Sequence, residues 1–183
     1  MASSKLIRWS GLVSMAGGLL VIASAAIELL GDSPPDVMEF VTFLLLLLGL
    51  VGLYVRQARK AGAVGAIGFL LAFIATALWA GLFYGDAFYG GPPQEVTAVF
   101  FVAYVSFPLG YLLFGIATMR AGMLPRWGAL LLAVGAVLLN FLVPVSVVLA
   151  AIGFAMFGAA FLWLGYALWS GTGETERQPK PST

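Results

Sequence analysis

Carboxylates cluster in two short regions of this 183-residue chain, which has only eight Asp and Glu residues in all. One region runs from Glu28 to Glu39, and the other contains Asp86 and Glu95. Asp32 and Asp86 each follow a glycine and precede a Pro-Pro pair, so we expect them at the same end of the fold. Carboxylates gathered in this way attract cations, although solvated loop carboxylates are the alternative. The predicted outer polar cluster consists of Glu28, Asp32, Tyr84 and Asp86.

Glu28 is the acid of this cluster that a helical pattern turns toward the protein interior. It shares one helix face with small or hydroxylated residues at steps of three and four, namely Ser10, Ser14, Gly17, Val21 and Ser24. Small and polar residues mark helix–helix contacts in membranes. A carboxylate below the lipid headgroups needs a donor, a cation or a proton. We expect a hydroxyl such as that of Tyr84, Tyr104 or Thr97, or a backbone N–H, to donate to it, or else the acid to be partly neutral through desolvation. Local pairing or a position at the interface is the alternative.

Five aromatic side chains alternate at steps of four and three, which predicts a continuous aromatic stripe on one helix face. Small residues run beside the stripe, from Ala103 through Gly110 to Ala117. Aromatic rings beside a glycine can hold a lipid tail, a quinone or a polyene, because ligand pockets are mostly apolar with few polar anchors. Core packing or contact with lipid is the alternative. The predicted apolar-ligand groove consists of Phe100, Tyr104, Phe107, Tyr111 and Phe114.

The remaining polar residues have structural interpretations. Asp36 followed by Glu39 is a capping pattern that opens a helix, and Glu95 lies in a first helical turn, where the helix dipole favours negative charge. The chain has no Cys and no His, and it contains no Walker loop, dinucleotide fingerprint or GxSxG elbow. We therefore predict no catalytic residue, no metal site, no cofactor and a non-enzymatic function.

The elements that must position these residues are membrane-spanning helices. Hydrophobic residues make up 62% of the chain and charged residues only 9%, whereas soluble chains carry about 25% charged residues. A bilayer core about 30 Å thick needs roughly 20 apolar residues per helix. The sequence predicts an all-α membrane protein with six transmembrane helices, at about Ser10–Leu30, Val37–Val55, Ala61–Tyr84, Glu95–Met119, Trp127–Leu142 and Val145–Trp169.

The basic residues orient these predicted helices. They fall at the N-terminus, in the second and fourth connections, or in the tail, and six crossings place all of these regions on one side. By the positive-inside rule that side is the cytoplasm, so both termini are predicted to be cytoplasmic. We expect a multi-pass protein of the bacterial plasma (inner) membrane. The nine bases are Lys5, Arg8, Arg56, Arg59, Lys60, Arg120, Arg126, Arg177 and Lys180.

The chain is predicted to form a single transmembrane domain over residues 1–170, with a polar, disordered cytoplasmic tail over residues 171–183. Three repeated helical hairpins would make up the domain, at about residues 7–61, 61–122 and 124–170. The repeat is indicated by glycines eight residues beyond Trp9, Lys60 and Trp127, which are Gly17, Gly68 and Gly135. For the first helix a cleaved signal peptide is the alternative, because Ala23-Ser24-Ala25 resembles a cleavage site.

Short motifs give the chain a resemblance to a loose group of uncharacterised six-helix bacterial membrane proteins, often from actinobacteria. They are Arg8-Trp9-Ser10-Gly11, residues 62–68, and Phe107-Pro108-Leu109-Gly110 running to Leu124-Pro125-Arg126-Trp127-Gly128. The likeness covers most of residues 7–170. Since that group has no agreed activity, the resemblance implies the six-helix topology and leaves the activity open. The three-hairpin plan is also similar in architecture to the acid-resistance membrane protein family of enterobacteria.

These patterns favour an accessory membrane protein that binds lipid, another apolar ligand or partner helices. The alternative is a small-solute channel or transporter with an acidic extracytoplasmic mouth. A continuous polar lining would favour transport, and a dry core with an aromatic groove would favour binding. The expected partners are membrane lipid and other membrane proteins or a second copy of the chain. A net charge of +1 gives no support for nucleic-acid binding.

Overall fold

The computed structural model describes residues 2–91, 97–142 and 145–171, and its regular structure in these ranges is entirely helical. The predicted all-α fold is therefore confirmed. Glu95, the turn at 143–144 and the predicted tail beyond Gly171 lie outside the described residues. The helices are α1 (Ala2–Leu29), α2 (Asp36–Tyr89), α3 (Thr97–Ala121), α4 (Arg126–Leu142) and α5 (Val147–Ser170).

Helix α2 replaces the separate second and third helices that the sequence predicts. A straight helix of its 54 residues would be about 80 Å long, far more than a bilayer needs. The chain folds back at Gly62, whose φ of 61° and ψ of −167° suit glycine because it has no Cβ. Tyr54 stacks on Phe69 with ring centroids 4.1 Å apart, which places the two halves of α2 side by side. No loop is needed because the basic stretch 56–60 stays helical.

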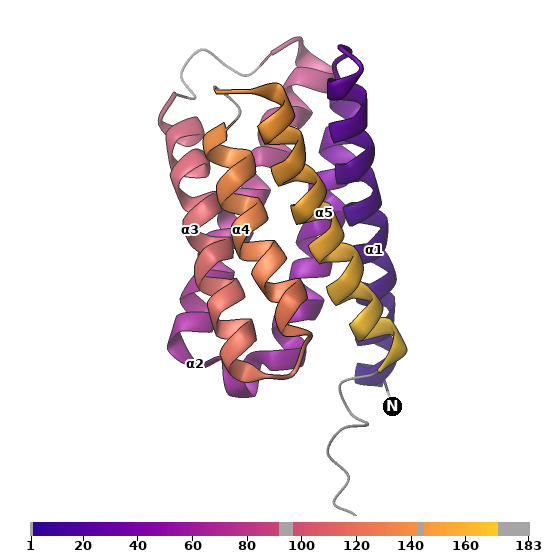
Figure 1. The fold of residues 1–183 in the computed structure, drawn as a ribbon, viewed down its shortest axis with the longest axis vertical. Helices are drawn as coiled ribbons and strands as arrows, with labels where there is room; N and C mark the ends of the chain where they lie inside the picture. Colours follow the sequence, from indigo (N-terminus) through magenta and orange to yellow (C-terminus); the bar gives the residue numbers. More distant parts are fainter. Residues whose placement is uncertain (1, 92–96, 143–144, 172–183) are drawn as a thin grey trace, which may run out of the picture.

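The helices form a closed ring around one core. Each helix packs against its neighbours in sequence, and α5 returns to pack against α1, as Figure 1 shows. Aromatic and aliphatic side chains from α2, α3 and α5 fill the centre and are almost completely buried, including Leu46, Leu50, Leu53, Phe107, Tyr111, Phe114, Phe157 and Phe161.

Glycines bring the backbones of these helices into contact. A Cβ added to Gly18 of α1 would lie 2.5 Å from the carbonyl oxygen of Gly158 of α5, and one added to Gly11 would lie 2.6 Å from that of Gly165. A Cβ on Gly68 of α2 would lie 2.5 Å from the backbone nitrogen of residue 114 in α3. Such close approach is how membrane helices gain packing contacts without a hydrophobic driving force.

The outer surface of the bundle is apolar on every side. Four of the described helices, α1 from Lys5 onward, α2, α3 and α5, are long and apolar enough to cross a membrane, whereas α4 has only 17 residues. Large exposed hydrophobic side chains occur on all five helices, for example Leu19, Leu48, Phe101, Leu130 and Ile152. Soluble monomers rarely expose apolar surface continuously, so these features are those of a membrane protein.

The two ends of the bundle carry opposite charges. One end, here called the acidic end, holds Glu28, Asp32, Asp36, Glu39 and Asp86. The other, the basic end, holds Lys5, Arg8, Arg56, Arg59, Lys60, Arg120 and Arg126. Exposed Trp9 and Trp127 lie near the basic end, and exposed Tyr84 and Tyr89 near the acidic end. Aromatic side chains of this kind border both faces of membrane proteins.

Candidate functional site

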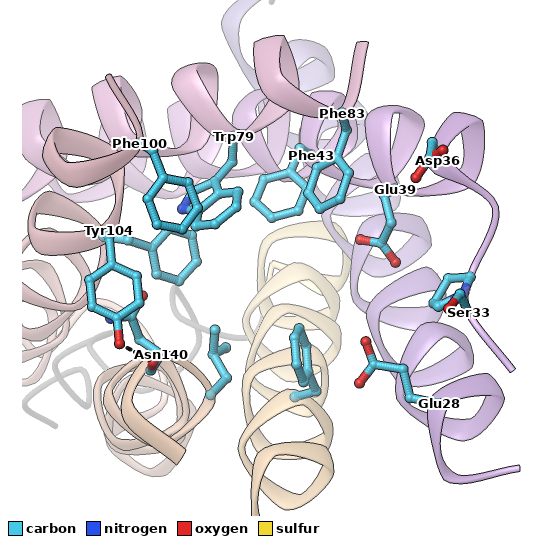
Figure 2. Close-up of a pocket in the computed structure, with 14 residues that line it drawn as sticks. Glu28, Ser33, Asp36, Glu39, Phe43, Trp79, Phe83, Phe100, Tyr104 and Asn140 are labelled. Atoms are coloured by element: carbon cyan, nitrogen blue, oxygen red, sulfur yellow. Dashed lines mark hydrogen bonds between the residues drawn. The ribbon is translucent and has the colours of Figure 1, made fainter. Parts of the chain in front are cut away.

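A cavity of about 540 Å³ opens at the acidic end, where five helices contribute to its walls. Its volume lies within the range of roughly 300–1,000 Å³ that is usual for sites of small molecules. Figure 2 shows the side chains around it. The lining residues are Glu28, Ser33, Pro34, Asp36, Glu39, Phe43, Trp79, Phe83, Phe100, Tyr104, Phe107, Leu139, Asn140 and Phe154.

One wall of the cavity consists of aromatic rings in mutual contact. The ring centroids of Phe43 and Phe83 lie 5.3 Å apart, and those of Trp79 and Phe100 lie 5.4 Å apart in an edge-to-face arrangement. Phe100 stacks in turn on Tyr104 at 6.0 Å. The wall therefore joins both halves of α2 to α3, and these contacts fix its shape because aromatic pairs favour such geometries.

The opposite side of the cavity carries carboxylates. Glu28 comes from the last turn of α1, and Asp36 and Glu39 from the first turn of α2. The side chains of Glu28 and Glu39 extend toward one another across the loop that joins these helices (Figure 2). Their charges interact unfavourably with each other. The site is therefore a carboxylate pair that faces an aromatic wall.

No basic side chain of the described residues lies near these carboxylates. Along α1, Arg8 and Glu28 are separated by 20 positions, which corresponds to about 30 Å of helix. The other described bases also belong to the basic end. Charges that are partly removed from water need compensation, and the described part of the chain supplies no cation for it.

An amide group at the far side of the cavity is buried without a partner. Asn140 of α4 is 5% exposed and lines the cavity, and its Nδ2 atom has no hydrogen-bond partner. The Tyr104 hydroxyl donates a 2.8 Å hydrogen bond to the backbone carbonyl of Asn140, which holds this end of α4 against α3. Buried donors without partners are rare in folded proteins, so the unpaired Nδ2 atom costs the fold free energy.

The cavity narrows toward the membrane centre and is closed there by aromatic side chains. A small void of about 20 Å³ follows it, lined in part by Ser24, Glu39 and Phe157. The Ser24 hydroxyl is buried there; it interacts electrostatically with Glu39 but makes no hydrogen bond of ordinary geometry. Below this void, fully buried Tyr111 shares a 2.9 Å hydrogen bond with Thr76. The cavity is therefore a pocket with a closed floor.

The predicted aromatic groove is divided between the cavity and the core. Phe100, Tyr104 and Phe107 line the cavity, whereas Tyr111 and Phe114 are completely buried beneath it. The stripe continues along one face of α3 as its spacing indicates, but only its outer half borders open space.

The predicted outer polar cluster is also divided. Glu28 lies in the cavity wall, while Asp32, Tyr84 and Asp86 do not line it. Tyr84 packs instead against the rings of Phe40, with centroids 5.4 Å apart, and of neighbouring residues of α2. No hydrogen bond to the Glu28 carboxylate is found among the described residues. The predicted hydroxyl donor is therefore wrong, because Tyr104 donates to a backbone carbonyl on α4.

The capping role expected for Asp36 and Glu39 is wrong as well. The residue that caps α2 is Pro35, and no side chain makes a capping hydrogen bond there. Both acids do lie in the first turn, where the helix dipole favours them, and both line the cavity. Their spacing of three residues resembles a capping pattern, yet both lie inside the first turn and the side chain of Glu39 is turned toward Glu28.

Several residues that line the cavity were not predicted from the sequence. Trp79 and Phe83 follow the helical spacing of α2 without standing out in a chain so rich in aromatic residues. Asn140 carries a detectable signal, since it is an amide inside an otherwise apolar segment.

No group of three or more acidic residues suitable for a metal ion occurs among the described residues. Comparisons of the chain with protein-family models, curated proteins and solved structures found no match, so the interpretation of the cavity depends on its own chemistry.

Proposed function

We propose that the protein crosses the bacterial inner membrane six times, with the basic end in the cytoplasm and the acidic end outside. The two halves of α2 supply two of the crossings, and α4 is the short one. The separation of seven described bases from five described acids at opposite ends of the bundle supports this orientation, because basic residues are retained on the cytoplasmic side.

The six crossings form three repeated hairpins in this proposal. Gly17 packs on residues 45 and 46 of α2, Gly68 on residues 113 and 114 of α3, and Gly135 on Phe157 of α5. Each of these glycines lies on the first helix of its hairpin and contacts the backbone or Cβ of the second. Equivalent contacts at equivalent places support an internal repeat.

The function that the geometry supports best is the binding of a small molecule with an apolar body in the cavity at the acidic end. The carrying observation is the cavity itself, about 540 Å³ with an aromatic wall and a few polar groups. Such a composition is typical of ligand sites. In this proposal the protein acts as an accessory binding protein of the membrane rather than as an enzyme, since the lining is mostly aromatic and aliphatic with only a few polar groups.

Native mass spectrometry of the protein extracted in mild detergent tests this function. Ser33 lies at the rim of the cavity, whereas nearby Val37 is exposed and does not line it. The Ser33→Trp variant should lose a bound apolar molecule that wild type and the control Val37→Trp retain. Equal retention in all three proteins would show that the molecule is bound elsewhere.

A small-solute transporter is the second candidate, and one observation favours it. Buried polar pairs continue from the cavity toward the basic end, first Thr76 with Tyr111 and then Gln57 with Thr118. The aromatic floor closes this route, so transport would require Phe107 and Tyr111 to move. Uptake of a cavity ligand into proteoliposomes, above the leak of protein-free vesicles, would establish transport; binding without uptake would leave the accessory function.

A further inference from the structure

The ligand of the cavity must be compatible with an unusual distribution of charge. Three carboxylates line the wall, those of Glu28, Asp36 and Glu39, and no basic side chain is described at this end of the bundle. Repulsion between Glu28 and Glu39 is relieved when a positive charge lies between them. An anionic ligand would add to the repulsion, and a neutral ligand would leave it unchanged.

The aromatic wall distinguishes among cations. The rings of Trp79, Phe83 and Phe100 face the same space as the carboxylates (Figure 2). Aromatic faces attract ammonium groups through the ring quadrupole. A hard metal ion instead requires six or more oxygen ligands, and the described carboxylates form no group that could hold one. Carboxylates opposite aromatic rings therefore suit an organic cation.

The amide of Asn140 is the polar group on the far side of the cavity from the carboxylates. It is 5% exposed, its Nδ2 atom has no partner, and it lies across the cavity from Glu28 and Glu39. The polar groups thus stand at two sides of the cavity, with the aromatic wall between them.

We propose that the cavity binds a monovalent organic cation, an ammonium-type head group joined to an apolar body. The head group lies between Glu28 and Glu39, and the body lies along Phe43, Trp79 and Phe100. This inference depends on the proposed function of the same site and specifies its ligand class. A zwitterion that also carries a phosphate is disfavoured, because the phosphate would face the same carboxylates without a base to pair with it.

Three probes with the same alkyl chain test the charge preference: decyltrimethylammonium, decylphosphocholine and decanol. The protein is reconstituted in nanodiscs of zwitterionic lipid, and binding is read from the fluorescence of Trp79. Trp79→Phe supplies the background, because the other four tryptophans lie toward the basic end, at positions 9, 127, 163 and 169. Decyltrimethylammonium should bind at least about tenfold more tightly than either other probe.

Charge-neutral variants locate the source of that preference. Glu39→Gln, alone or combined with Glu28→Gln, should remove the preference, so that decyltrimethylammonium binds no more tightly than decanol. Asp86→Asn is the matched control, since it removes one negative charge from the same end without touching the cavity. If Asp86→Asn reduces cation binding as much as Glu39→Gln does, the surface charge of the membrane face is responsible and the inference fails.

The outcomes separate the inference from the proposed function. Equal binding of all three probes by wild type overturns the cation preference, while the binding function stands. No change in Trp79 fluorescence with any probe overturns both. This comparison needs only wild type and the Trp79→Phe background, so it holds even if a Gln variant does not fold.

The same chemistry could reach the site from water or from the bilayer, and competition identifies which source supplies it. Displacement of decyltrimethylammonium by soluble short-chain ammonium compounds indicates a ligand from solution. Displacement by a few per cent of a two-chain trimethylammonium lipid in the nanodisc indicates a lipid. Either displacement supports the proposal, and failure of both to compete contradicts it.

Discussion

The acidic end and the centre of the bundle are made by the same helices, yet α2 and α3 border a cavity at the acidic end and are in close contact at the centre. Between α2 and α3, Gly68 and Gly110 let the two backbones touch in the membrane centre. Closer to the acidic end the same helices carry Trp79 and Phe100, whose rings meet at 5.4 Å. Glycines allow helices to approach closely, and large aromatic rings hold them apart. The positions of small and large residues along α2 and α3 therefore decide where the cavity opens.

The two ends also differ in how buried polar groups are treated. Toward the basic end, the Gln57 amide donates a 2.7 Å hydrogen bond to the Thr118 hydroxyl, and both side chains are buried. The Gln57 Oε1 atom is left without a partner, and at the acidic end so is the Nδ2 donor of Asn140. A buried donor paired within the chain stabilises the fold, whereas an unpaired one costs free energy. The following predictions test this contrast.

The largest expected effect concerns the sides of the membrane on which the two ends lie. The chain contains no cysteine, so single cysteines at exposed Asp32 and Lys60 can be labelled without background. Asp32→Cys should react completely with a membrane-impermeant maleimide in intact cells, and Lys60→Cys only after the membrane is opened. Labelling of both in intact cells would contradict the six-crossing topology.

The packed half should be sensitive to residue size in a way that the cavity half is not. Gly68→Leu places a side chain where the backbone of α3 already lies and should lower the free energy of unfolding by about 1–3 kcal/mol through overpacking. Gly81→Leu, in the same helix, meets nothing within 4 Å and should change it by less than about 0.5 kcal/mol. Unfolding in mixed detergent micelles measures both, and similar losses would refute the contact at Gly68.

The hydrogen bond near the basic end should contribute a smaller amount. Thr118→Val leaves the Gln57 amide without its partner and should cost about 1 kcal/mol. Removing both groups, with Gln57→Leu added, should recover most of that loss. Thr42→Val is the control, since the buried Thr42 hydroxyl bonds only to the Met38 carbonyl in its own helix at 2.8 Å. If the double variant is less stable than Thr118→Val, the pair is not coupled.

The smallest effect on stability is expected at the cavity. Glu28→Gln removes a charge that repels Glu39 and breaks no hydrogen bond among the described residues, so the free energy of unfolding should change by less than about 0.5 kcal/mol. The same unfolding experiment as for Gly68 measures it. A loss above 1 kcal/mol would mean that the carboxylate supports the fold rather than a ligand.

Much of this architecture can be predicted from the sequence because bilayer thickness fixes helix length. The apolar stretches and the segregation of bases indicate the helices and the two ends, and the spacing of Phe100, Tyr104 and Phe107 indicates a shared face. The fold-back at Gly62 is hidden because the basic run before it resembles a loop but remains helical.

The composition of the cavity is much harder to predict. In a soluble protein the polar face of a helix shows which side faces out, but lipid is as apolar as the core. The rotation of α4 that brings Asn140 to the cavity, and of α2 that brings Glu39 to Glu28, therefore leaves little trace in hydrophobic periodicity. Those rotations are set by contacts between backbones at glycines such as Gly153, which packs on residues 138 and 139 of α4.

The contact of the first helix with the last has a consequence for biosynthesis. Gly11 and Gly18 of α1 leave the ribosome well before their partners Gly165 and Gly158, which belong to α5. Until α5 has been synthesised, the glycine face of α1 must remain in the membrane without the α5 face that it contacts in the folded protein. Phe154, which lines the cavity, arrives on the same late helix. The cavity of the nascent chain is therefore incomplete until α5 enters the bilayer, so closure of the helix ring and completion of the cavity wall happen together.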